Sequence, residues 1–171
     1  MPHVFVSRPT ELATEQSNLY RHMETWLSER DLKVRTVGVT DFTNKTPLVK
    51  VGDVMRECSG AIIMGFRQME VRSAIEKPGT KYERARKRIY LPTPWNQIES
   101  GIAFTMHLPM LIVKEKGVVG GIFEMGSTDQ YVHSIELPDE HWISSPEFNQ
   151  PLSEWWDDVK RYASAAPEPQ L

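Results

Sequence analysis

The stretch Gly60-Ala-Ile-Ile-Met64 decides the fold of this chain. A short, unbroken apolar run that contains β-branched residues is typical of a strand buried on both faces of a sheet. A second such run, Pro109-Met-Leu-Ile-Val113, follows a helix that is expected from Pro94 to about Met106. Two buried strands with a helix between them predict parallel pairing through a right-handed crossover.

The same alternation of strand and helix continues outward from this centre. Further strands are expected at residues 3–7, 32–39 and 131–137, and further helices at residues 10–30, at 46–58 and from Ser153 onward. The pattern predicts an α/β protein, a single-domain flavodoxin-like three-layer sandwich with a mostly parallel central sheet over residues 1–165. Residues 166–171 are expected to form a flexible tail.

The composition narrows the class of function. The chain has 171 residues, enough for one buried core, and a formal net charge of −3, which is too balanced for a dedicated nucleic-acid binder. The single cysteine, Cys58, excludes an intramolecular disulfide and suits a reducing compartment. The N-terminus lacks a signal-peptide pattern and no stretch is apolar for long enough to span a membrane, so we expect a cytoplasmic protein. The five histidines show no metal-ligand spacing, and neither a metal nor a cofactor is expected.

Two segments depart from the regular alternation. Residues 65–93 form a long connection with eight basic and three acidic residues, and we expect a solvated helical arm that covers a crevice or contacts another subunit. Residues 117–129 are rich in glycine and are a candidate lid near the same edge of the sheet.

Ligands of α/β proteins bind at the carboxyl ends of the parallel strands. Here that edge is expected to be lined by Ser7, Arg8, the loop 40–46, the segment after Met64 and the segment from Lys114 onward. Arg8 is a candidate to meet a pyrophosphate, with a surface ion pair as the alternative. Phe42, Phe66 and Trp95 are candidates to stack on a planar ligand ring, with ordinary packing as the alternative for each.

The stretch most informative about chemistry is Thr93-Pro-Trp-Asn-Gln-Ile-Glu99-Ser-Gly-Ile-Ala103. Thr93 and Pro94 form a helix start, so Trp95 and Glu99, four residues apart, are expected on one helix face. The positive end of the helix dipole is expected to keep Glu99 ionised. A carboxylate and an indole on one wall of the crevice make a candidate active site.

This stretch, with the pattern Thr-x-Trp-x-x-x-Glu, resembles the catalytic helix of Toll/interleukin-1 receptor (TIR) domains that cleave NAD. Val4-Phe-Val-Ser7 resembles the first strand of that family, and Val54-Met-Arg-Glu-Cys-Ser-Gly-Ala-Ile-Ile-Met64 resembles its second helix and third strand. The resemblance implies NAD as substrate rather than cofactor, Glu99 as the catalytic carboxylate and Trp95 as a wall of the pocket. It also implies a role in immune or antiphage signalling, as a homo-oligomer or with a partner TIR-type protein. The loop 40–46 lacks the Gly-Pro-type sequence of the family's association loop.

The helix Gln97-Ile-Glu-Ser-Gly-Ile-Ala103 and the following Leu108-Pro-Met-Leu-Ile-Val113 are also similar to the Glu-containing helix and next strand of nucleoside 2-deoxyribosyltransferases. Both resemblances imply attack on an N-glycosidic bond. Nicotinamide leaves a cationic ring as a neutral base and needs no general acid, whereas adenine or thymine requires protonation, and no second acid is evident. An NAD glycohydrolase or cyclase is therefore the leading prediction. A nucleoside or nucleotide N-glycosidase or deoxyribosyltransferase, and a non-catalytic module that binds a nucleotide or another TIR domain, are the alternatives.

Overall fold

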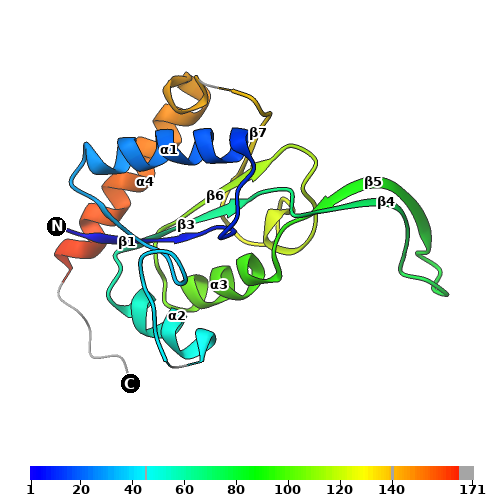
Figure 1. The fold of residues 1–171 in the computed structure, drawn as a ribbon, viewed down its shortest axis with the longest axis horizontal. Helices are drawn as coiled ribbons and strands as arrows, with labels where there is room; N and C mark the ends of the chain where they lie inside the picture. The colour runs from blue at the N-terminus through cyan, green and yellow to red at the C-terminus, as the bar shows by residue number, and fades with distance from the viewer. Residues whose placement is uncertain (45, 140, 166–171) are drawn as a thin grey trace.

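Five parallel strands form the central sheet in a computed structural model that describes residues 1–44, 46–139 and 141–165 (Figure 1). The strands are β1 (His3–Ser7), β2 (Lys33–Arg35), β3 (Gly60–Gly65), β6 (Met110–Glu115) and β7 (Val132–Ile135). Their order across the sheet is β2-β1-β3-β6-β7, and each neighbouring pair is parallel. The first strand thus lies inside the sheet, the second forms one edge, and the later strands add in turn toward the other edge. This is the flavodoxin-like strand order.

Helices cover both faces of this sheet (Figure 1). One face carries α1 (Thr14–Ser28) and α4 (Pro146–Ser164), and the other carries α2 (Pro47–Arg56) and α3 (Pro94–Thr105). Two separate hydrophobic clusters fill the spaces between the sheet and each helical layer. Two 3-10 helices, η1 (Gly121–Phe123) and η2 (Trp142–Ser144), lie in the connections before and after β7. The predicted flavodoxin-like three-layer α/β sandwich is confirmed.

The starts of the first and last helices differ from the prediction. The helix α1 begins at Thr14 rather than Thr10, and the Oε1 atom of Gln16 accepts a hydrogen bond from the Ala13 amide at 3.0 Å at its start. The helix α4 begins at Pro146, because a proline at the first helical position has the required backbone angle and no amide to satisfy. Residue Ser153, expected to cap this helix, lies inside it.

The strand expected at residues 32–39 is shorter than predicted. Its extended part, β2, ends at Arg35, and the backbone turns at Thr36, whose carbonyl accepts hydrogen bonds from the amides of residues 39–41. This turn returns the chain to the carboxyl edge of the sheet before α2 begins.

The prediction of a helical arm within residues 65–93 is wrong, because this segment forms a β-hairpin. The strands β4 (Met69–Glu76) and β5 (Arg84–Leu91) pair antiparallel as a separate two-stranded sheet that projects from the body of the molecule (Figure 1). β-branched residues such as Val71 and Ile75 favour strands, and Pro78-Gly79 favours a turn between them. Residues 69–91 are called the arm below.

The layered part of the protein runs from β1 to α4. Residues 166–171, expected to be a flexible tail, lie outside the described residues. Within the described ranges no helix has the length and apolar character needed to cross a membrane.

Candidate active site

The buried face of α3 carries polar residues toward the carboxyl edge of the sheet. Asn96, Glu99 and Ser100 are all buried on it, at the spacing of neighbouring turns. The predicted start of this helix is confirmed: Thr93 is the N-cap, and its hydroxyl accepts a hydrogen bond from the Asn96 amide at 3.2 Å. The cap fixes the first turn, and the first turn fixes the direction in which Glu99 points.

A short chain of hydrogen bonds links this helix to two strands. The Nδ2 atom of Asn96 donates to the Ser7 hydroxyl at 2.8 Å, and it lies 3.4 Å from the carbonyl oxygen of Met64. Ser7 is the last residue of β1, and its hydroxyl lies near enough to the carboxyl group of Glu99 to lower the pKa of that group. Ser7 and Glu99, both predicted as site residues, are therefore brought together, at the edge where ligands of this fold bind.

Burial changes the charge state expected for Glu99. Its side chain is enclosed, with 8% of the residue exposed, and burial raises its pKa to about 7, against a smaller lowering by the Ser7 hydroxyl. The helix N-terminus was expected to help keep Glu99 ionised, but at this pKa the group is only partly ionised near neutral pH. Loss of hydration outweighs the helix dipole, because a dipole stabilises a nearby charge by only about 0.3–1 kcal/mol.

Glu115 shows how a buried carboxylate of this protein is satisfied when its role is structural. It is also 8% exposed, but it lies 3.2 Å from Nε of Arg67 and accepts hydrogen bonds from Gln16 and from the Arg67 amide at 2.8 and 3.0 Å. Glu99 has no such cation: among the described residues its side chain forms no ion pair, and the Ser7 hydroxyl is the polar side chain that lowers its pKa. A buried carboxylate without a counter-charge is costly unless a ligand supplies one.

The other predicted site residues are dispersed. Trp95 is 40% exposed at the first turn of α3, so its ring is available at the surface while Glu99 points inward. Phe42 is 75% exposed in the loop after β2. Phe66 is buried in the core beneath α1 and α4. Arg8 lies over the ring of Tyr20 at 4.3 Å and donates to the carbonyl of Pro9 at 2.7 Å, so its side chain is directed toward α1.

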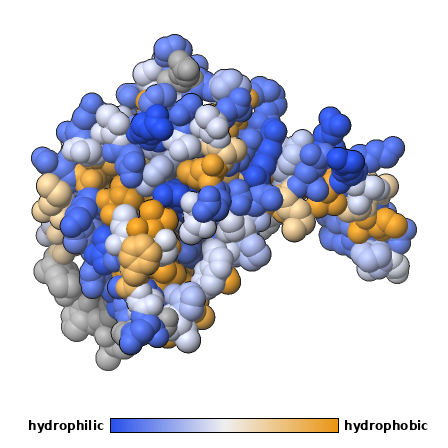
Figure 2. Space-filling view, viewed as in Figure 1, coloured by the Kyte–Doolittle hydropathy of each residue, from blue (hydrophilic) through white to orange (hydrophobic). Residues whose placement is uncertain are grey.

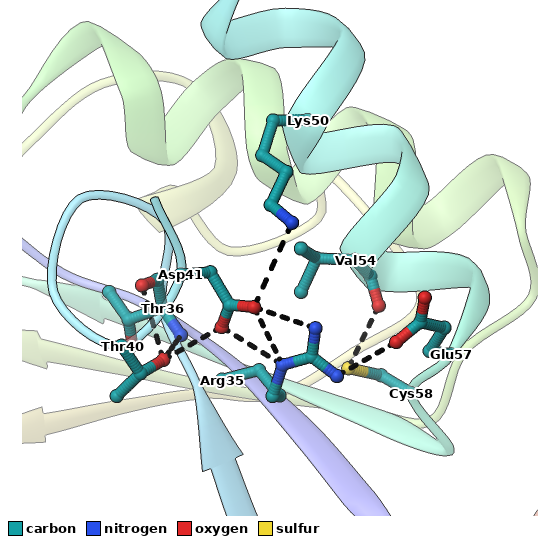
Figure 3. A network of polar contacts seen from close by, with 8 residues as sticks. All are labelled: Arg35, Thr36, Thr40, Asp41, Lys50, Val54, Glu57 and Cys58. Carbon is teal, nitrogen blue, oxygen red and sulfur yellow. Dashed lines mark hydrogen bonds and ion pairs between the residues drawn. The ribbon is translucent and has the colours of Figure 1, made fainter. Parts of the chain in front are cut away.

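The loop that carries Phe42 is held by a polar network (Figure 3). Nε of Arg35 donates to the carboxylate of Asp41 at 2.9 Å, and Nη1 donates to Glu57 at 2.9 Å. The guanidinium group lowers the pKa of Asp41, and Thr40 donates a further hydrogen bond to it at 2.8 Å. This network ties the loop to the C-terminal end of α2.

Cys58 lies at the border of the same network (Figure 3). Its thiol donates to the carbonyl of Val54 at 3.3 Å, and burial raises its pKa to about 12. A thiol that stays protonated is a poor nucleophile. Cys58 is therefore part of the packing beneath α2.

The glycine-rich segment after β6 is fastened to α3. The side chain of Gln97 accepts a hydrogen bond from the Ile122 amide at 2.9 Å and donates to the Gly120 carbonyl at 3.2 Å. Gly121 has a φ of +56°, and a Cβ atom there would lie 1.9 Å from Oε1 of Gln97. The position requires glycine, and the segment proposed as a lid packs against the helix that carries Glu99.

Asn96 is the residue of the site that the sequence reasoning did not select. The sequence contains a signal for this position. Asn96 follows the Thr93 cap by three residues and precedes Glu99 by three, and this spacing places it on the same inward face of the helix. Within the residues that the structure describes, no group of three or more histidine, cysteine, aspartate or glutamate side chains is arranged to hold a metal ion.

We expect Asn96→Ala to destabilise the protein by about 1–3 kcal/mol, because Ser7 and the Met64 carbonyl would lose a buried donor. Urea unfolding followed by circular dichroism measures this change. Ser100→Ala is the matched control, since the Ser100 hydroxyl donates only to the Gln97 carbonyl within its own helix. Equal losses in both variants would contradict a role of Asn96 in joining α3 to the sheet.

The fold and the site define a flavodoxin-like α/β protein with a buried carboxyl group at the carboxyl edge of its sheet, which has no ion-pair partner among the described residues. No protein-family model matches the chain, and a search of curated proteins finds no significant match. Its function is therefore argued from the site itself.

Proposed function

We propose that the protein cleaves the N-glycosidic bond between nicotinamide and ribose in NAD, with Glu99 as the catalytic carboxylate. The observation that carries this proposal is the state of Glu99, which is buried, near Ser7 and without a cation among the described residues. Such a group favours a ligand that brings positive charge to it. The nicotinamide ring of NAD is cationic, and positive charge moves to the ribose as the bond breaks. The resemblance to NAD-cleaving TIR domains points to the same residue.

The main contribution that the reaction requires from the protein is the negative charge of the Glu99 carboxylate. The electron pair of the glycosidic bond leaves with nicotinamide, which departs as a neutral base and requires no proton. The ribose becomes oxocarbenium-like, and the carboxylate of Glu99 stabilises it electrostatically. Water then adds to the anomeric carbon and loses one proton, which gives linear ADP-ribose. Attack by a second atom of the substrate in place of water gives a cyclic product.

The raised pKa of Glu99 is compatible with this role. A cation within about 4–6 Å favours the ionised form of a carboxyl group, so bound NAD would lower the pKa of Glu99 again. The charge of Glu99 would then develop when the cationic substrate arrives. The ring of Trp95, exposed one turn before Glu99, is the candidate to stack on the substrate.

The pKa of about 7 also supports a second candidate, a nucleoside or nucleotide N-glycosidase or deoxyribosyltransferase. Release of a neutral nucleobase requires a proton donor, and a carboxylic acid that remains protonated near neutral pH is suited to that task. One experiment separates the two functions. The purified protein is incubated with NAD and, separately, with a panel of nucleosides, and the products are resolved by chromatography. Free nicotinamide supports the proposal, nucleobase release supports the second candidate, and binding without turnover supports a nucleotide-binding module.

The pH dependence of the reaction distinguishes the two roles of Glu99. If the ionised form is required, kcat/KM for nicotinamide release rises with pH through about 7 and is constant above it, because the free protein must lose the Glu99 proton. If the protonated form is required, kcat/KM falls over the same range. A steady-state profile from acidic to alkaline pH, on protein shown to be folded throughout, provides the measurement. A falling profile would contradict the electrostatic role proposed for the carboxylate.

A further inference from the structure

The arm and the rest of the chain carry opposite net charges. Residues 69–91 hold seven basic and three acidic residues, a net charge of +4, within a chain whose formal charge is −3. The remaining residues therefore carry a net charge of −7. Figure 1 shows the arm projecting away from the body, so most of this positive charge stands apart from the negative charge of its own chain.

The arm also exposes hydrophobic side chains. Alternation along β4 places Met69, Val71 and Ile75 on one face of the hairpin, opposite Leu91, Ile89 and Ala85 of β5. Met69 and Ile75 are exposed, and Tyr82 is exposed near the tip. Figure 2 shows hydrophobic and hydrophilic side chains together on the projecting arm. A two-stranded ribbon is marginal in water by itself, and an uncovered apolar face is typical of a protein contact surface.

A groove of complementary character flanks β7. It consists of two adjoining hollows of about 410 and 200 Å³ that share Tyr131 and His133. Its acidic lining residues are Asp129, Glu136, Asp139, Glu147, Glu154 and Asp158. Among the residues described as lining it there is no lysine or arginine, although Lys116 and Arg161 outside the lining pair with Glu136 and Asp158. Phe104 and Tyr131 expose aromatic surface in the larger hollow.

The arm and the larger hollow of this groove lie at opposite edges of the sheet, whereas the smaller hollow extends along β7 to Glu136 at the carboxyl edge. The arm follows the carboxyl end of β3, whereas the larger hollow is lined by Pro109 and Met110 at the amino end of β6 and by Tyr131 just before β7. Since all the strands run parallel, these ends face opposite directions. An arm therefore leaves the sheet at the edge away from the larger hollow of its own chain, and the arm of a second molecule can enter that hollow.

We infer that the arm of one copy of this chain seats in the β7 groove of a second copy. The exposed Met69, Ile75 and Tyr82 meet aromatic surface, and the arm's cations meet the groove's carboxylates. The contact uses different surfaces on the two copies, so it is head to tail and continues into a ring or a filament. The inference is independent of the reaction proposed for Glu99.

Charge reversal tests this contact in the full-length protein by sedimentation velocity over a wide range of concentration. The arm variant is Lys81→Glu with Lys87→Glu, and the groove variant is Asp129→Lys with Glu154→Lys. The wild type should associate, less so at high salt, and each variant alone should lose association. A mixture of the two variants should associate again, because the reversed arm fits the reversed groove and the unchanged arm fits the unchanged groove.

The control variant, Arg21→Glu with Lys33→Glu, makes the same change in net charge as the arm variant but outside the arm and the groove, and it should associate as the wild type does. The inference is overturned if the wild type stays monomeric at every concentration, if the mixture of variants does not regain association, or if the control loses association equally. Arm-dependent binding of a DNA or RNA duplex by a protein that does not self-associate would also overturn it, in favour of a nucleic-acid ligand. Restored association in the mixture shows at once that both variants are folded.

Discussion

Glu99→Gln should reduce nicotinamide release by a few hundredfold or more while the protein remains folded. Glutamine keeps the shape of the side chain near Ser7, but it cannot carry the negative charge that opposes the positive ribose. Loss of about 3–4 kcal/mol of transition-state stabilisation corresponds to this change in rate. Binding of NAD, measured by calorimetry, should fall much less than turnover, because the full charge on the ribose develops only as the bond breaks.

The matched control for this experiment is Glu15→Gln. It makes the same chemical change in the first turn of α1, at an exposed position, and should leave turnover unchanged. Equal rates for the wild type and Glu99→Gln would exclude Glu99 as the catalytic group. If concentrated wild-type protein releases no nicotinamide, the proposed reaction is contradicted and a nucleotide-binding module is favoured.

The same substitution should stabilise the protein at alkaline pH. Because burial raises the Glu99 pKa from 4.5 to about 7, the folded protein holds the Glu99 proton more tightly than the unfolded chain does. The stability that this proton contributes is complete below pH 4.5 and is lost as the pH rises through about 7. Glutamine does not titrate, so Glu99→Gln should exceed the wild type by about 3 kcal/mol in free energy of unfolding at pH 8. Below pH 4.5 the two proteins should be nearly equal.

Urea unfolding of both proteins at several pH values measures this difference directly. Glu115→Gln should behave in the opposite way and destabilise the protein, because it breaks the buried contact with Arg67 and removes the charge that the Arg67 side chain faces. A constant difference between Glu99→Gln and the wild type across the pH range would show that Glu99 is not buried in the unpaired state described here.

Much of the fold could be predicted from short apolar runs in the sequence. Gly60-Ala-Ile-Ile-Met64 and Pro109-Met-Leu-Ile-Val113 form neighbouring strands, and Thr93-Pro94 starts the helix between them. The arm could not be predicted in this way. Its strands mix charged and apolar residues and pack against no second layer, so the hydrophobic pattern that identifies a buried strand is absent. Runs of charge favour a solvated helix, whereas this segment turns at Pro78-Gly79 and forms a hairpin.

The position of the site was easier to predict than its electrostatics. The rule that ligands bind at the carboxyl ends of parallel strands placed Ser7 near Glu99, although 92 positions separate them in the chain. The pKa of Glu99 depends on how completely neighbouring side chains exclude water, and no local pattern reports that quantity. The same limitation applies to Phe66, which lies at the predicted edge in sequence but packs into the core.

The arm begins and ends at one place on the molecule. The Gln68 amide donates to the Leu91 carbonyl at 3.0 Å, so the hairpin closes where it opens, between β3 and α3. The arm can therefore change in length or charge during evolution without altering the path of the chain into α3. That path places Thr93 at the N-cap and Glu99 near Ser7. The contact surface and the catalytic residue that we propose are encoded in adjacent segments, and each segment can change without the other.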